Sequence, residues 1–524
     1  MKRSYIKRLL ENMSGKNQDN QPPDDVDDNS NHFSTDIRKN EKMLSEQLGT
    51  SQDVMLTKFK IKLHNSDDVD AMLVAIDGLV DEEVKRNNVI KPLIEPPLEK
   101  DPSKDLASIR ERLAVKSAVI EGDPEKVLQK VLKAQAFLLI DGLSEGLLIS
   151  IEGFEIRSIE EPETEQIVRG SREGFIESLS VNLSMVRRRI ASPSLRFETM
   201  EIGEYSQTDV TIAYIKDIVD PKIVHEVKSR ICQIKVDNIN SSGDIEQLIE
   251  DHPYSIFPTI GNTERPDKVS RLLMHGRVVI FVDGDPICLY APFLFVESMK
   301  NIEDYISRPY YTSFIRLIRF FSFALSITLP ALYISAVNFN KALIPSSLIV
   351  PLTVARESVP FPLALEVMIM IIMFEVVREA GVRLPKQVGT AVTIVGPLIL
   401  GDVAVSTSLV GAPTVIIVSI SFIAAFVITP IADVTALLRI ALFGATCLFG
   451  SYGLTMMLLA VFTHMVSLTS LGIPYMAPFS PFHFRDWKDA LIRFPTKVIK
   501  RRSESIPNLR SKKIDSIPDS EDKQ

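Results

Sequence analysis

The chain has 524 residues, which is more than one hydrophobic core usually supports, so we expect two or three folding units. Its formal net charge of −8 argues against a nucleic-acid-binding protein. Three cysteines far apart in the sequence, Cys232, Cys288 and Cys447, suggest neither a disulfide framework nor a structural metal site and favour a reducing compartment.

The N-terminal region is polar. Residues 1–52 are rich in Asn, Asp, Ser, Gln and Lys, so they bury too little apolar surface to offset the entropy of ordering, and we predict a disordered tail. The first residues are basic but precede no apolar stretch, which is not the pattern of a secretory signal. We therefore expect this region to stay in the cytoplasm.

Two soluble segments resemble each other. PEKVLQKVLKAQAFLLIDG (124–142) and PDKVSRLLMHGRVVIFVDG (266–284) align without a gap at an offset of 142. In each, a proline opens a predicted helix, which is followed by a short apolar strand that ends in an Asp-Gly turn. A second pair, AIDGLVDEEV (75–84) and YIKDIVDPKI (214–223), aligns at an offset of 139.

Nearly equal offsets indicate a duplicated α/β subdomain. We place the first copy at 53–165, where VMLTKFKI (54–61) alternates like a half-buried strand, and the second copy at 194–300. Chance similarity between amphipathic segments is the alternative.

A linking helix is predicted at 166–193, from SREGFIESLSVNLSMVRRRI, with Ser171 as its N-cap. Arg187, Arg188 and Arg189 fall in its last turn and point in different directions. They form either a solvated helix end or an interface to a carboxylate or a neighbouring subunit.

No motif indicates an enzyme. The sequence lacks the Walker A, H-E-x-x-H and G-x-S-x-G patterns, and no G-x-G-x-x-G follows a strand. Asp141 and Asp283 each lie in an Asp-Gly turn, and turn chemistry explains them better than a catalytic pair. Glu366 and Glu375 fall on different helical turns without a second catalytic group. We predict no catalytic activity and no cofactor.

The chain becomes apolar after a connector at 301–319, and we predict a membrane domain over 320–482. The first span is 320–340, where Pro330 kinks the helix and neighbours satisfy the freed carbonyl. The second span is 360–381. Basic residues precede the first span and follow the second, which places both flanks in the cytoplasm.

The third span is 389–411 and the fourth is 413–430. The uncharged run 440–484 is interrupted at FGSYG (449–453), so it predicts a split hairpin or two further spans. The basic tail, 483–524, favours an even number of crossings and a cytoplasmic C-terminus.

Two acids inside the spans are of particular interest, Glu366 and Asp402, because a charge at bilayer depth should face protein or water. Asp402 shares the third span with the Gly396-Pro397 break. On a helix, one face of this span holds small or hydroxylated residues, namely Thr390, Thr393, Pro397, Gly401, Ala404 and Ser408. That face either packs closely against another helix or lines water.

Several motifs, in order along the chain, resemble one family. They are SREGFIESLSVNLSMVRRRI, SGDIEQLIEDHPYSIFPTIGNTERPDKV, HGRVVIFVDGDP, ARESVPFPLALEV and FEVVREAGVRLPKQVGTAVTIVG. Together, from about residue 55 to 500, they resemble the A subunit of the GerA-type spore germinant receptors. The expected fold is a duplicated α/β cytoplasmic domain followed by a polytopic α-helical membrane domain.

The resemblance implies a protein of the spore inner membrane that acts with a transporter-like B subunit and a C-subunit lipoprotein. It also implies a ring of identical chains, proposed to be pentameric, that forms a nutrient-gated cation channel. The pore-lining candidates are then Thr390, Thr393, Val395, Gly396, Pro397, Leu398, Gly401, Asp402, Ala404 and Ser408. The alternative function is a secondary transporter, or a membrane signalling scaffold whose soluble domain binds a small molecule.

Overall fold

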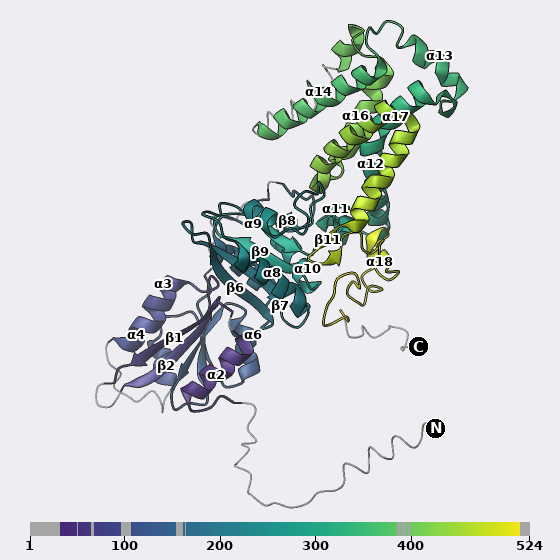
Figure 1. The fold of residues 1–524 in the computed structure, drawn as a ribbon. Helices are drawn as coiled ribbons and strands as arrows, with labels where there is room; N and C mark the ends of the chain where they lie inside the picture. The colour runs from purple at the N-terminus through teal and green to yellow at the C-terminus, as the bar shows by residue number, and fades with distance from the viewer. Residues whose placement is uncertain are drawn as a thin grey trace, which may run out of the picture.

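The structure is a computed structural model in which two α/β units precede a bundle of helices (Figure 1). It describes residues 32–49, 51–63, 68–95, 106–153, 161–162, 164–384, 389, 395–396, 399 and 401–513.

The first α/β unit is built on an antiparallel sheet with strand order β1-β2-β4-β5-β3. Its strands are β1 (Val54–Ile61), β2 (Val69–Ile76), β3 (Ala118–Glu121), β4 (Gln135–Ile140) and β5 (Gly146–Ser150). Its helices are α2 (Ile37–Leu48), α3 (Glu82–Val84), η1 (Lys85–Ile90), α4 (Lys91–Ile94), α5 (Leu106–Arg112) and α6 (Pro124–Val131). Apolar side chains form a buried cluster on each face of the sheet.

The second α/β unit repeats this arrangement with strand order β6-β7-β9-β10-β8. Its strands are β6 (Leu195–Ile202), β7 (Thr208–Ile215), β8 (Gly261–Thr263), β9 (Val278–Val282) and β10 (Cys288–Ala291). Its helices are α7 (Leu179–Arg189), α8 (Pro221–Gln233), α9 (Ser242–Ile249), α10 (Pro266–Met274), α11 (Phe295–Ser298) and η2 (Ile302–Tyr305). The two helix–strand pairs that align in the sequence are α6–β4 and α10–β9.

The duplication extends further towards the N-terminus than the sequence analysis suggests. In the first unit, the Asn40 side chain bonds both backbone groups of Ser34, and in the second, Asn182 does the same with Ile176. The turn carboxylates also correspond, because Asp141 Oδ1 accepts from the amide at the start of α2 and Asp283 Oδ1 from the amide at the start of α7.

This correspondence corrects two predictions. The prediction of a disordered tail through residue 52 is wrong for α2, whose Leu44 and Leu48 are buried against the first sheet. The prediction of a linking helix at 166–193 is also wrong in extent and role. Helix α7 begins after Ser178, so Ser171 is not its N-cap, and α7 is the counterpart of α2. The segment before α7 is instead held by a hydrogen bond from the Phe175 amide to the second unit.

The bundle contains most of the remaining helices, with α13 and α14 at the end farthest from the sheets (Figure 1). The elements are α12 (Pro309–Ile334), η3 (Ser335–Phe339), η4 (Lys341–Leu343), α13 (Ser346–Val354), α14 (Leu363–Arg383), α16 (Ala412–Phe426), η5 (Thr429–Ile431) and α17 (Ala432–Ser467). They are followed by β11 (Thr469–Ser470), β12 (Ile473–Pro474) and α18 (Trp487–Ala490). By length and composition, two helical runs in the described chain could cross a membrane, Pro309–Phe339 and Ala432–Ser467.

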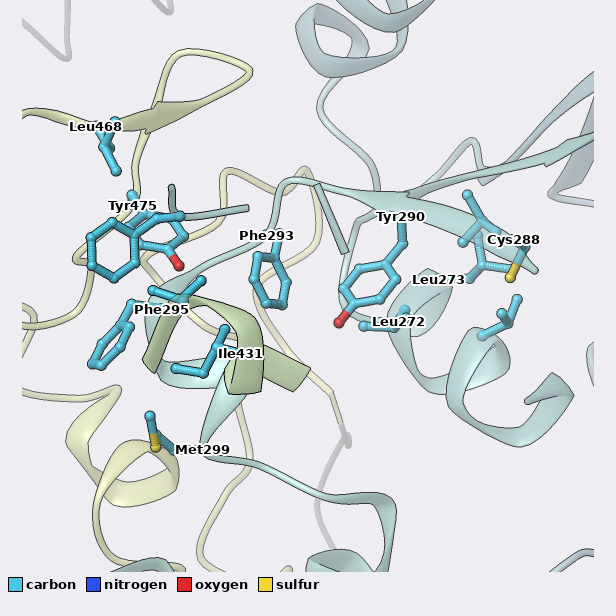
Figure 2. Packing of buried hydrophobic residues seen from close by; sticks show 14 of the residues in the cluster. Leu272, Leu273, Cys288, Tyr290, Phe293, Phe295, Met299, Ile431, Leu468 and Tyr475 are labelled. Atoms are coloured by element: carbon cyan, nitrogen blue, oxygen red, sulfur yellow. The ribbon is translucent and has the colours of Figure 1, made fainter. Parts of the chain in front are cut away.

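The run Ala432–Ser467 reverses direction at Gly450, whose φ of 62° and ψ of −144° are not helical. A Cβ placed on Gly453 would lie 2.1 Å from the Ala445 carbonyl oxygen, whereas residues eight apart on a straight helix are about 12 Å apart. Ile431 before the run and Leu468 after it lie in one cluster (Figure 2). The chain therefore turns back within the predicted interruption at 449–453.

Replacing Gly450 by alanine should destabilise this turn by about 3 kcal/mol, because the conformation is open to glycine and a Cβ would lie 2.7 Å from the Phe339 ring. The melting temperature of the purified protein in detergent measures the effect. Gly444→Ala is the matched control, since its Cβ meets nothing within 4 Å. Equal melting temperatures for both variants would contradict the reversal.

The second unit and the bundle share one hydrophobic core. Phe293 and Phe295, just after β10, pack against Tyr475, which follows the bundle (Figure 2). The C-terminal segment also returns to the second unit, where Ile506 is buried and Asn508 pairs with Val219. The described part of the predicted C-terminal tail, up to residue 513, therefore contacts the second unit and is partly buried.

Candidate functional site

The buried acid of the bundle is Glu366, in the first turn of α14, and it is completely inaccessible to solvent. Its carboxylate accepts hydrogen bonds from Arg356 Nη2 at 3.0 Å, from the Gly411 amide at 3.1 Å and from Thr414 Oγ1 at 3.1 Å. Gly411 is the N-cap of α16, so two helix N-termini and a guanidinium stabilise the negative charge. Glu366 therefore joins three segments of the bundle.

Pro330 lies inside α12 and leaves the carbonyl of Ser326 without its helical donor. That oxygen accepts hydrogen bonds from Ser421 Oγ at 2.7 Å and from Arg439 Nε at 2.9 Å. The prediction that neighbours satisfy the carbonyl freed by Pro330 is confirmed. The arrangement also explains why a buried arginine is tolerated in α17.

A second charged cluster surrounds Arg439. Its Nη1 lies 3.0 Å from Glu375 Oε1, and its guanidinium stacks over the Phe422 ring at 4.1 Å. Arg378 bridges Glu375 at 2.8 Å and Asp433 at 3.2 Å. These ionisable residues of the predicted membrane domain thus neutralise one another between α14 and α17.

The third predicted span is described only in part. Thr390, Thr393, Pro397 and Leu398 lie outside the described residues. Gly401 and Ala404 are buried, and a Cβ on Gly401 would lie 3.2 Å from a Val415 methyl group of α16. Within this chain, these two small residues therefore pack closely against neighbouring side chains, which is the first of the two roles considered for this face of the span.

Other candidates from this span have different surroundings. Val395 and Asp402 are exposed, and Gly396 and Ser408 are half-buried. Asp402 borders an open groove of about 710 Å³ between α14 and α16 that Arg378 also borders. Among the residues that the structure describes, none forms a hydrogen bond or an ion pair with Asp402.

The three arginines of α7 have separate partners. Arg187 is buried, with Nε 2.6 Å and Nη2 3.0 Å from the carboxylate of Asp53, the residue before β1. Arg188 and Arg189 both bind Glu173. All three therefore contact carboxylates of the same chain, and Arg187 joins the second unit to the first.

Sequence reasoning missed Arg356, the partner of Glu366. It lies between α13 and α14 and is the last arginine before the second predicted span. A lone arginine ten residues before an acid in an apolar segment was the available signal, because buried acids require a partner.

Comparison with known proteins identifies relatives of this chain. Residues 42–505 match the family described as "Bacillus/Clostridium GerA spore germination protein". "Spore germination protein KA" of Bacillus subtilis (strain 168) is 39% identical, with the match covering 90% of this chain and 87% of that protein. "Spore germination protein GerLA" of Bacillus cereus is 39% identical, with coverage of 72% and 78%.

The chain is also similar to a solved structure, the N-terminal domain of the A subunit of the Bacillus megaterium spore germinant receptor GerK3. It is 33% identical, and the match covers 50% of this chain and 97% of that chain with a TM-score of 0.38.

Proposed function

Because this chain belongs to the GerA family of spore germination proteins, whose members include A-type receptor subunits, we propose that it forms a cation channel with further copies of itself. The channel opens in response to nutrient and starts germination. The chain acts in the spore inner membrane with a transporter-like B subunit and a C-subunit lipoprotein, in a ring proposed to be pentameric. Its role is not catalytic.

The surface of the bundle supports a membrane location. Large apolar side chains are exposed on several of its helices, among them Phe321, Ile423, Leu437, Leu459 and Phe462. Such a surface is unfavourable in water and is covered by lipid or by neighbouring subunits in a membrane.

The path of the chain supports a multi-pass arrangement with both soluble ends in the cytoplasm. The reversal at Gly450 makes α17 a pair of antiparallel arms, and the C-terminal segment packs on the second α/β unit. An even number of crossings is consistent with this return.

The observation on which the channel proposal depends is the exposed carboxylate of Asp402. Glu366, Glu375 and Arg439 are neutralised inside the chain, whereas Asp402 has no described partner. A carboxylate that faces lipid is unfavourable by several kcal/mol, so Asp402 must meet water or a second subunit. A ring of copies around an aqueous path provides both, and the acid then attracts cations.

Replacing Asp402 by asparagine is expected to reduce cation flux about fivefold, because removing a charge near the ion path removes about 1 kcal/mol of attraction. Flux is measured with the purified receptor in liposomes and as cation release from spores that carry the variant as their only copy. Ser406 is another exposed polar residue of the same helix, and Ser406→Ala should leave flux unchanged.

Wild-type flux in the Asp402→Asn receptor at normal protein level would remove this residue from the ion path. The mass of the purified assembly is an independent test. A pore requires a closed ring, whereas a monomer or dimer would favour the secondary-transporter alternative.

A further inference from the structure

A cavity of about 340 Å³ lies between the second α/β unit and the C-terminal segment. Helix α10 and the chain around α11 form one wall, and residues 485–513 form the other. The volume is in the range of small-molecule sites. The ion path proposed above does not need this cavity.

The cavity has a large excess of positive charge. Of the described residues that line it, ten are lysine or arginine and three are acidic. The three carboxylates already have partners in the protein: Glu297 binds Arg277, and Asp486 accepts from the 503–505 segment. Asp489 binds Arg316 and Tyr305 and lies 3.8 Å from Lys300 Nζ. Four of the ten lining cations, namely Lys268, Arg277, Lys300 and Arg485, pair with carboxylates. The other six form no ion pair with a described carboxylate.

Arg271 of α10 shows the imbalance most clearly. Its guanidinium lies over the Tyr305 ring, with the central carbon 3.8 Å from the ring centroid. Its Nε is buried without a hydrogen-bond partner, and no described carboxylate forms an ion pair with it. Stacking fixes the plane of the guanidinium and leaves its edge available for an acceptor with several oxygens.

Neighbouring cations are held close together around this arginine. Burial, together with the charges of Arg316 and Arg277, lowers the pKa of Lys300 to about 8, although Asp489 and Asp486 act in the opposite direction. Burial and the nearby Lys513, Arg277 and Lys300 lower the pKa of His275 well below its usual value, which Asp489 opposes. A bound anion would relieve this repulsion.

We propose that the cavity binds a small anion of the phosphate class, held by Arg271 and Lys300 of the second unit and by Lys513 of the C-terminal segment. A phosphate group offers about one to two negative charges and several acceptor oxygens, which suit a stacked guanidinium flanked by ammonium groups. Because the two walls belong to segments far apart in the sequence, the ligand links the C-terminal segment to the second unit.

Two sources present this chemistry, a soluble phosphate compound and a lipid headgroup, since the cavity lies near the start of α12. Inorganic pyrophosphate is the soluble probe, titrated by calorimetry into the full-length protein in phosphate-free detergent at pH 7. Vesicles that contain phosphatidylglycerol, compared with phosphatidylcholine vesicles, provide the lipid arm.

We expect Arg271→Gln and Lys300→Gln each to weaken binding at least tenfold, because each removes a charge-assisted hydrogen bond. Lys300→Arg should retain binding, and Lys222→Gln, on the exposed start of α8, should not change it. Affinity should fall from pH 7 to pH 9, as Lys300 loses its proton around pH 8. Lys300→Gln removes a charge that burial disfavours, so it keeps the test decisive if Arg271→Gln does not fold.

Pyrophosphate binding that depends on Arg271 and Lys300 would support a soluble ligand. Binding only to phosphatidylglycerol vesicles, with the same dependence, would support a lipid headgroup. Failure of both probes to bind, or binding unaffected by either substitution, would overturn the proposal. Asp402→Asn should leave anion binding unchanged, so this test and the channel test fail independently.

Discussion

Replacing Glu366 by alanine is expected to destabilise the bundle by about 3–5 kcal/mol, because it leaves the charge of Arg356 unpaired among helices. The amide of Gly411 and the hydroxyl of Thr414 lose their acceptor at the same time. The melting temperature of the purified protein and its amount in spores should both fall.

Two further variants separate this ion pair from a general effect of substitution in α14. Glu379→Ala removes an exposed acid of the same helix that pairs with Arg383, so its effect should be below about 1 kcal/mol. The double variant Arg356→Leu, Glu366→Leu should recover much of the lost stability, because no buried charge remains unpaired. A double variant no more stable than Glu366→Ala would contradict the pairing.

The second large effect is expected for Arg187→Ala at the junction of the two α/β units. The substitution leaves the buried carboxylate of Asp53 without its ion-pair partner, which destabilises the junction by about 3–5 kcal/mol. Gln52 and Phe197 provide a local measurement, since their backbone groups are hydrogen-bonded across this junction. Hydrogen exchange at both amides should accelerate strongly.

Arg188→Ala is the matched control, one residue further along the same helix. Arg188 is partly exposed and binds Glu173, so its loss should change exchange at the junction little. Unchanged exchange in Arg187→Ala would show that the ion pair does not hold the units together.

Much of the fold is predictable where local pattern determines it. Pro124 and Pro266 open helices, the Asp-Gly turns follow the strands, and the chain reverses near Gly450. These features can be predicted because each depends on backbone chemistry within a few residues. Helix α2 is not predictable in this way. Its sequence is polar, and its order comes from distant contacts, such as the hydrogen bond to Asp141.

The candidate site shows the same division. The sequence identifies Glu366 as an acid that needs a partner, but not the choice among the arginines, which depends on how α13, α14 and α16 meet. Likewise, the basic C-terminal residues predict a cytoplasmic tail, whereas in the structure they form a wall of a cavity with α10. Pairings between elements distant in sequence leave no periodic signal within either one.

The aromatic cluster of Phe293, Phe295 and Tyr475 has a mechanical consequence (Figure 2). Tilting α12 against the second sheet would expose these rings, at about 1.5–3 kcal/mol for each side chain. The helices and the second sheet therefore move together as one rigid body. Relative rotation falls instead on the junction with the first unit. Its described contacts include hydrogen bonds from Arg196 and Thr199, the ion pair of Arg187 with Asp53, and the close approach of Gly78 to α7.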